Sequence, residues 1–89
     1  MRAVIAVIGK DMVGILAGVS TLCTEVNVNI TEVTQSVMQD LFAMIMLVDI
    51  SGCTIPFTEL SDRMESLGAK MGLSVKIMHE DIFNSMHRV

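Results

Sequence analysis

The sequence predicts an α+β domain in which a four-stranded antiparallel sheet carries two helices on one face. Three observations lead to this prediction. Strand-like and helix-like segments follow one another in the order strand, helix, strand, strand, helix, strand. Two of the strand segments are apolar on both faces, which is typical of the centre of a sheet. The 89 residues leave room for one core only, so we expect residues 1–89 to form a single domain.

The first strand, the first helix and the second strand are expected within residues 2–38. Residues 2–8 are almost entirely apolar, and the helix is expected to begin at Asp11 or Met12 and to end at Asn27. Its apolar positions recur at helical spacing in one stripe: Ile15, Leu16, Val19, Leu22, Cys23 and Val26. The other side carries small residues, which permit close approach by another helix, including one from a second subunit: Ala17, Gly18, Ser20, Thr21 and Thr24. Residues 28–38 mix β-branched and polar side chains, which indicates a partly exposed strand.

The third strand and the second helix are expected after a tight turn at Gln39 and Asp40. The strand, residues 41–50, has two apolar faces: Phe42, Met44, Met46 and Val48 on one, Leu41, Ala43, Ile45 and Leu47 on the other. Thr54 is expected to cap the second helix, with Pro56 in the first turn, where proline is tolerated. The predicted buried stripe of this helix is Phe57, Leu60, Met64, Leu67 and Met71, and Gly72 is expected to end it.

The chain closes with an alternating strand, residues 73–79, and a tail, residues 80–89, that predicts a short C-terminal helix. The apolar side of this tail helix consists of Ile82, Phe83, Met86 and Val89. With right-handed crossovers, the order of the elements gives a ferredoxin-like βαββαβ sandwich, with the first and third strands in the middle. The two helices cover one face of the sheet, so we expect the tail helix or a second subunit to cover the other.

The composition limits the classes of partner. Hydrophobic residues make up 52% of the chain and aromatic residues only 3%, so a domain this small is expected to hide its apolar surface as a homodimer or higher homo-oligomer. The net charge of −4 and the scattered basic residues argue against nucleic acid. The longest apolar run, residues 41–48, is too short to span a bilayer, and the N-terminus does not resemble a signal peptide. We therefore expect a cytoplasmic protein with no membrane partner.

The cysteines and histidines do not predict a metal or a cofactor. Cys23 and Cys53 lack metal-binding or redox spacing and are expected to be reduced thiols, Cys23 on the apolar helix face and Cys53 in a turn. His79 and His87 flank two acidic residues, but surface histidines are commoner than metal sites of that kind. We expect no metal and no cofactor.

Residues 9–18, which directly follow the first strand, carry the most information about function. The loop holds Lys10 and Asp11, and the first turn of the helix is expected to hold Gly14 and Ile15. A helix start presents free backbone N–H groups, and a glycine leaves room for close approach. This arrangement suits a small anionic or zwitterionic molecule. Structural alternatives stay open: Asp11 as a helix cap, Lys10 as a solvated charge and Gly14 as a packing residue.

Three features of the chain resemble a known family. They are the pattern V-x-G-K-D-x-x-G-I at positions 7–15, the pair Asn29-Ile30 at the start of the second strand, and the order of the elements. Together they resemble the ACT domain, a small-molecule-sensing regulatory module, over nearly the whole chain. The resemblance looks closest to stand-alone single-ACT proteins and to the ACT halves of the glycine cleavage system transcriptional repressor. It implies dimers that join their second strands into an eight-stranded sheet.

In ACT domains that bind amino acids, the ligand lies where the first loop of one subunit meets the start of the partner's second strand. By position, the resemblance implies these ligand-binding residues: Gly9, Lys10, Asp11, Met12, Val13, Gly14 and Ile15, with Asn29 and Ile30 across the interface. Backbone N–H groups of residues 12–15 would bind the ligand carboxylate, Asp11 its ammonium group, and Asn29 would add amide hydrogen bonds. Turn chemistry after Asn27 is the alternative explanation of Asn29.

Serine specificity does not follow from the resemblance. Gly9 and Asp11 stand where serine-binding members often have His and Asn, and Val13 stands where Pro is frequent.

We therefore expect a non-catalytic regulatory module that binds a small ligand of the amino acid class at a dimer interface and signals to a regulated protein partner. The alternative is a protein–protein interaction module without a ligand, which docks a partner through its apolar sheet face. An enzyme is not expected. The loop has no Arg to cradle phosphate, no His or Cys to act as base or nucleophile, and no CxxC pair for metal transfer.

Overall fold

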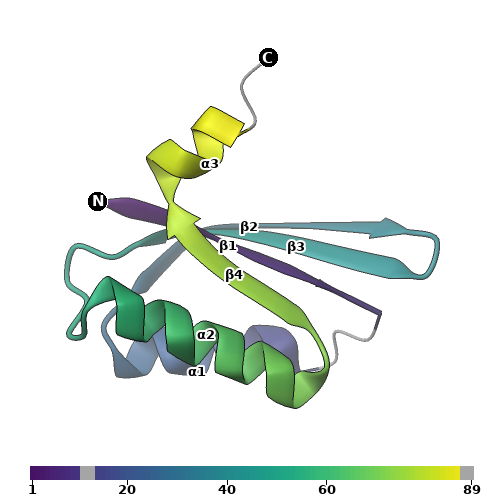
Figure 1. Ribbon diagram of the computed structural model, residues 1–89, viewed down its shortest axis with the longest axis horizontal. Coiled ribbons are helices and arrows are strands. Elements are labelled where there is room, and N and C mark those ends of the chain that lie inside the picture. The colour runs from purple at the N-terminus through teal and green to yellow at the C-terminus, as the bar shows by residue number, and fades with distance from the viewer. Residues whose placement is uncertain (11–13, 87–89) are drawn as a thin grey trace.

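The computed structural model describes residues 1–10 and 14–86. The elements follow in the order β1 (Arg2–Gly9), α1 (Ile15–Glu25), β2 (Asn29–Met38), β3 (Leu41–Asp49), α2 (Phe57–Met71), β4 (Ser74–His79) and α3 (Glu80–Met86). The strands form one sheet in the order β2-β3-β1-β4, with all neighbours antiparallel and with α1 and α2 on the same face (Figure 1). The predicted α+β sandwich with a short C-terminal helix is confirmed, and the first and third strands are central, as expected.

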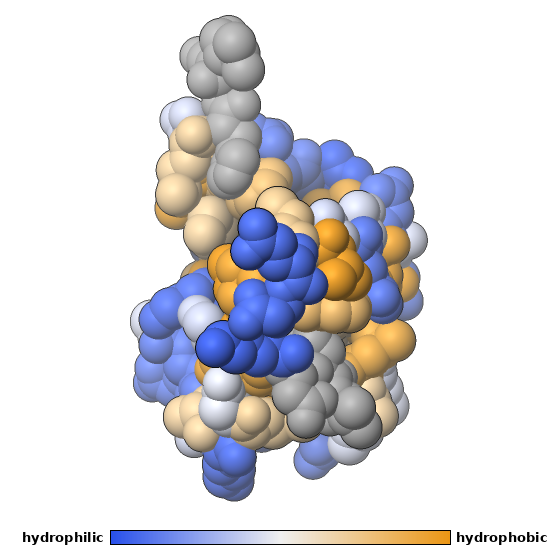
Figure 2. Space-filling model, turned by 90° about the vertical axis from the view of Figure 1, so that its right-hand side faces the viewer, coloured by the Kyte–Doolittle hydropathy of each residue, from blue (hydrophilic) through white to orange (hydrophobic). Residues whose placement is uncertain are grey.

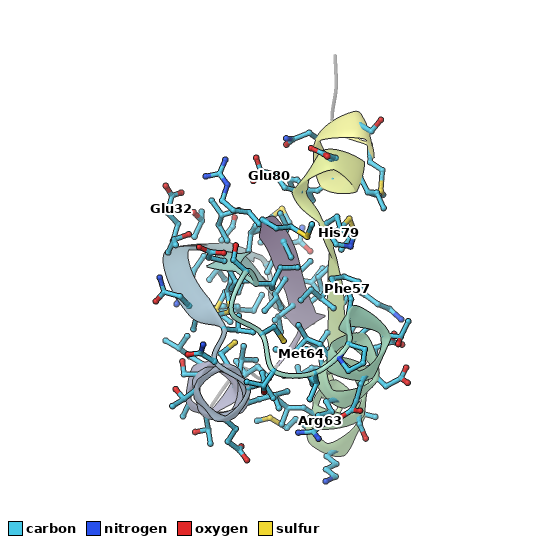
Figure 3. All side chains as sticks on the ribbon, turned by 90° about the vertical axis from the view of Figure 1, so that its left-hand side faces the viewer. Glu32, Phe57, Arg63, Met64, His79 and Glu80 are labelled. Carbon is cyan, nitrogen blue, oxygen red and sulfur yellow. The ribbon has the colours of Figure 1, made fainter. Side chains whose placement is uncertain are left out.

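The core lies between the sheet and the two helices. The register pairs Ile5 of β1 with Met46 of β3 and with Ile77 of β4, so these three side chains point to the same face. Leu60 and Met64 of α2 are completely buried against that face, and Met64 lies among the interior side chains in Figure 3. The core is aliphatic and rich in methionine, a side chain that fills irregular gaps.

The opposite face of the sheet is only partly covered. Figure 1 shows α3 standing above it, and α3 contacts β1 and β4. The guanidinium of Arg2 holds this helix by donating to the carboxylate of Glu80, with 2.8 Å between Nη2 and Oε1. Val4 on this face is 4% exposed, whereas Ile8 is 45% and Leu41 38% exposed. The far end of this apolar face therefore stays open.

Helix α1 begins later than the sequence predicted. It starts at Ile15 and not at Asp11 or Met12, because Gly14 stands at the N-cap position in the left-handed conformation, with φ 81°. Glycine adopts that conformation without steric cost, and it interrupts the helical path. Leu16, which the sequence assigned to the buried stripe, is 41% exposed.

Helix α2 also differs at its start. Pro56 occupies the N-cap position with an extended backbone, and the helix has no side-chain cap hydrogen bond, so Thr54 does not cap it as predicted. Gly72 ends the helix in the left-handed conformation, with φ 72°, as predicted. Within the described ranges, none of the helices is both long enough and apolar enough to cross a membrane.

Candidate functional site

The loop predicted to bind a ligand leaves the sheet at the end of β1. Gly9 pairs with Phe42 of β3, and a Cβ atom placed on Gly9 would lie 1.9 Å from Cδ2 of Leu73. Leu73 therefore packs directly on this glycine, which explains why no side chain stands here. Lys10 is exposed, and its Nζ lies 3.9 Å from Oδ2 of Asp40 in the β2–β3 turn. An exposed pair contributes little energy, but it marks the hairpin turn as a neighbour of the loop.

Within the described residues, α1 has no side-chain cap, because a glycine stands at its N-cap position. Gly14 is exposed, and its carbonyl accepts the first helical hydrogen bond from the N–H of Gly18 at 3.0 Å. The unpaired N–H groups of the helix therefore begin at Ile15, later in the chain than the predicted residues 12–15. The Ile15 side chain is 2% exposed and belongs to the core, so only its backbone is available to a ligand.

Three of the predicted site residues, Asp11, Met12 and Val13, lie outside the described residues, and their ligand contacts stay predictions. The cap position of α1 is nevertheless occupied by Gly14. Asp11 is therefore not the N-cap residue itself, whereas the hydrogen bonds of its side chain lie outside the described residues.

Asn29 and Ile30 lie at the opposite end of the sheet from the loop. Asn29 is exposed and pairs with Asp49, whereas Gly9 pairs with Phe42. These two β3 partners are seven residues apart, a span of about 23 Å along a strand. Ile30 is half-buried against the core. A single chain therefore does not bring the two halves of the predicted site together.

The Asn29 end of the sheet carries a fixed negative charge. Asp49 Oδ1 accepts a hydrogen bond from the Ser51 backbone N–H at 2.9 Å. Hydrogen bonds from the backbone and hydroxyl of Ser51 hold the pKa of Asp49 below its ordinary value, and the N-terminal ammonium and Arg2 add to this. Asp49 is therefore a carboxylate at neutral pH, and the N-terminal ammonium, 3.8 Å from its Oδ1, already balances its charge.

Strand β2 is an edge strand that exposes nearly its whole length. Apart from Ile30, all its residues are exposed, and Val33, Val37 and Met38 are 40%, 65% and 58% exposed. Figure 2 looks onto the end from which the β2–β3 hairpin projects, and apolar surface lies on both sides of its polar tip. A long exposed edge of this kind is a template for pairing with another chain.

The remaining chemically reactive side chains have structural roles. Burial raises the pKa of the Cys23 thiol to about 11, with Cys53 adding to the shift, so Cys23 stays protonated at neutral pH. The His79 ring stacks on Phe57 with 4.3 Å between ring centroids (Figure 3). Over residues 1–10 and 14–86, no group of three His, Cys, Asp or Glu side chains could hold a metal ion. His87 lies outside that part of the chain.

Comparison with known proteins agrees with this geometry. A model of the ACT domain family matches residues 2–78. A UPF0237 protein of Clostridium acetobutylicum is 48% identical over 89 residues, which is the full length of both chains. The structure of an ACT domain protein from Streptococcus pneumoniae is 36% identical, covers 98% of each chain and superimposes with a TM-score of 0.80. A structure described as a glycine cleavage system transcriptional repressor shares the fold at 24% identity and a TM-score of 0.68, over 86% of this chain and 44% of its own. The chain therefore belongs to the ACT domain family, within the group of UPF0237 proteins.

Proposed function

We propose that this chain is a non-catalytic regulatory module that binds a small ligand of the amino acid class between two copies of itself. The observation that carries the proposal is the start of α1 at an exposed glycine, Gly14, with no capping side chain among the described residues, in a chain of the ACT domain family. ACT domains are typically small-ligand regulatory modules. A helix start that no side chain occupies keeps its N–H groups and its positive dipole end available to a carboxylate.

The ligand is held by complementary groups from two chains. Its carboxylate accepts hydrogen bonds from the backbone N–H groups that begin at Ile15, and its ammonium group is bound by Asp11. Asn29 of the second copy adds amide hydrogen bonds.

Antiparallel pairing of two β2 strands supplies the second half of the site. A pair centred on Val33 and Thr34 sets Asn29 of one copy beside Met38 of the other. Met38 pairs with Leu41, next to the residue that pairs with Gly9. The same pairing removes two exposed edges and buries the apolar side chains along β2. One interface thus completes both the ligand site and the sheet.

A thermal-unfolding screen with each of the twenty amino acids tests the proposal. A ligand that binds only the folded protein stabilises it by about 2.7 kcal/mol at a hundredfold excess over Kd. We expect one amino acid, or a few of similar shape, to raise the Tm in proportion to the logarithm of its concentration. The variants Asp11→Ala and Asn29→Ala should lose this rise while keeping the far-UV circular dichroism of the wild type.

Asn84→Ala is the matched control, because Asn84 is an exposed asparagine in α3, away from both halves of the site. It should keep the full ligand-dependent rise. A protein whose Tm responds to none of the amino acids, or whose Asn29→Ala variant responds like the wild type, contradicts the proposed site.

One observation favours the alternative function, a docking module without a ligand. The open end of the sheet face exposes Ile8, Met38 and Leu41 by 45%, 58% and 38%. A protein partner could cover this surface. The two functions differ in the screen: the docking module shows no change in Tm with any amino acid, and the substitution Ile8→Lys would remove partner binding without affecting a ligand response.

A further inference from the structure

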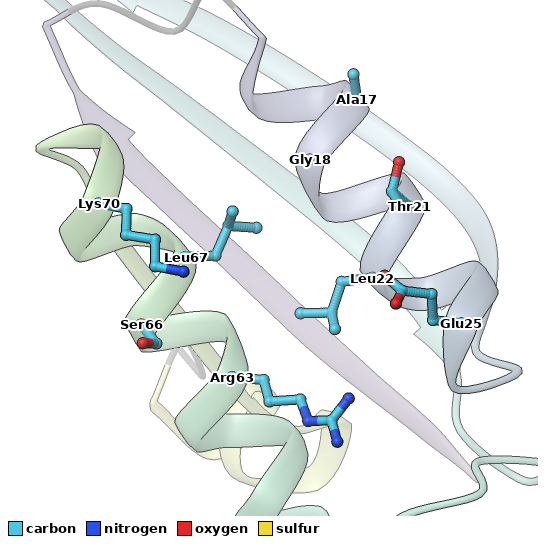
Figure 4. Close-up of a pocket in the computed structure, with 9 residues that line it drawn as sticks. All are labelled: Ala17, Gly18, Thr21, Leu22, Glu25, Arg63, Ser66, Leu67 and Lys70. Atoms are coloured by element: carbon cyan, nitrogen blue, oxygen red, sulfur yellow. The ribbon is translucent and has the colours of Figure 1, made fainter.

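A groove of about 540 Å³ runs between α1 and α2 on the side of the molecule away from the sheet. Figure 4 shows Leu22 of α1 and Leu67 of α2 reaching toward one another across it. The helices come close at Gly18, where an added Cβ would lie 3.4 Å from Cδ1 of Leu67. Both leucines are only partly buried. The floor of the groove is therefore apolar surface that the monomer leaves accessible.

The outward side of α1 is unusual because it lacks charge. The helix carries no charged residue between Ile15 and Thr24, and its single charge is Glu25. Helix α2, by contrast, carries charged residues along its whole length. A helix that faces water normally has charged and polar residues on its outer side, so the outer side of α1 is that of a helix covered by another protein surface.

The charges at the rim of the groove have opposite signs on the two helices. Arg63 and Lys70, seven residues apart on α2, line one side, and Glu25 lines the other. Arg63 Nη2 donates to Glu59 on its own helix at 2.8 Å, but a guanidinium has five N–H donors, so others remain for a partner. In Figure 4, Arg63 lies at the Glu25 end of the groove and Lys70 at the other end.

We propose that a second copy of this chain docks on the α1–α2 groove through the same groove of its own. The copies are related by a two-fold axis parallel to the helices, which lays α1 of each copy over α2 of the other. Because Arg63 and Glu25 lie at the same end, this rotation sets Glu25 of each copy opposite Arg63 of the other. The small residues Ala17 and Thr21 of α1 then admit the facing α2 closely.

This interface is separate from the β2 edge and does not depend on the ligand proposal. The helices lie on the opposite side of the sheet from α3, and β2 is at its edge (Figure 1). A molecule with two different self-complementary surfaces assembles beyond a dimer. Loss of the groove contact should therefore lower the mass of the assembly, to that of the monomer where the β2 edges do not pair and to that of a dimer joined through β2 where they do.

Sedimentation velocity and native mass spectrometry of the full chain test the proposal. The variant Thr21→Arg adds bulk and positive charge in the groove, opposite the basic side of the facing α2, and should lower the assembly mass to that of the monomer or of a β2-joined dimer. Thr58→Arg, an exposed threonine in α2 outside the groove lining, is the matched control and should leave the mass unchanged. An unchanged mass for Thr21→Arg, or a wild type that is already monomeric, overturns the proposal.

A charge exchange separates a specific contact from damage to the fold. Glu25→Arg and Arg63→Glu each place like charges opposite one another, and each should lower the assembly mass as Thr21→Arg does. The double variant restores both opposite-charge contacts and should recover the wild-type mass. If the double variant shows the summed effects of the two single substitutions on the assembly mass, the proposed pairing of Glu25 with Arg63 is overturned. The ligand screen is read separately, so failure of either proposal leaves the other testable.

Discussion

The substitution Gly9→Ala tests whether packing or ligand access explains the glycine that ends β1. An alanine Cβ here would lie 1.9 Å from Cδ2 and 3.2 Å from Cγ of Leu73, so the leucine must move. Leu73 is 8% exposed and belongs to the core, where overpacking typically costs about 1–3 kcal/mol of unfolding free energy. We expect a loss of about 2 kcal/mol for Gly9→Ala.

Removing the leucine should reverse the sign of this effect. The nearest Leu73 atom that remains in Leu73→Ala is Cβ, at 3.5 Å, which is ordinary van der Waals contact. Within a strand, alanine is then favoured over glycine by about 0.5–1 kcal/mol, because it loses less backbone entropy on folding. Gly9→Ala should therefore be neutral or stabilising in the Leu73→Ala background, although Leu73→Ala itself costs about 2–4 kcal/mol.

Urea unfolding of the four proteins of this double-mutant cycle, followed by far-UV circular dichroism, measures the coupling. All four must be compared at one protein concentration, because assembly contributes to apparent stability. We expect a coupling free energy above about 1 kcal/mol, because the double variant should lose less unfolding free energy than the sum of the losses in Gly9→Ala and Leu73→Ala. If Gly9→Ala costs the same in both backgrounds, the packing explanation of Gly9 is refuted.

Three further predictions concern stability and thiol chemistry. Gly72→Ala should cost about 1 kcal/mol in urea unfolding, because the φ of 72° is strained for alanine while no atom lies within 4 Å of its Cβ; no loss would contradict the strain. At pH 8, iodoacetamide followed by peptide mass spectrometry should label Cys53 well before Cys23, whose pKa is about 11, and equal labelling would count against this burial. A hydrogen bond from Lys76 and its positive charge lower the pKa of Glu65 in the folded protein. The pair therefore adds its full contribution to the free energy of unfolding above pH 4.5, which is the ordinary pKa of this carboxyl. That contribution disappears as the pH falls through the lowered pKa of the folded state. The loss of stability in Lys76→Met should therefore shrink between pH 7 and pH 3, and a pH-independent loss would exclude this linkage.

The arrangement of strands was predictable from local patterns. Residues 2–8 and 41–50 are apolar at successive positions, and that pattern occurs where both faces of a strand are covered, so their central places follow. Gly72 was predictable as a helix stop because it follows the last residue of an apolar stripe. These features depend on a few neighbouring residues, and the sequence displays them directly.

The starts of the helices were not predictable in the same way. The left-handed backbone of Gly14 delays α1, and nothing near it in the sequence separates a glycine inside the first turn from one that precedes it. Leu16 fits the helical stripe, yet it is 41% exposed because it lies beside the edge of the buried face. The packing of Leu73 on Gly9 joins residues far apart in the chain, so it follows from the register and not from a motif.

The candidate site shows the same limit. Both of its halves were named from the sequence, but the order β2-β3-β1-β4 and the register of β3 are needed to see that they lie about 23 Å apart. The composition predicted an oligomer only in general, whereas this separation means that the proposed site needs a second chain at a specific place. The proposed ligand site therefore needs residues from two chains.

Mixing two variants that each fail to bind the ligand tests most directly whether the site is shared between two chains. In a mixed dimer of Asp11→Ala and Asn29→Ala chains, one site contains both substitutions and the other contains neither. Random mixing of equal amounts, after unfolding and refolding together, should restore about a quarter of the wild-type binding sites for the amino acid found in the thermal screen. Calorimetric titration of the mixture should show that this quarter of the sites binds the amino acid with wild-type affinity. If the mixture binds no more ligand than either variant alone, the site is not shared between two chains.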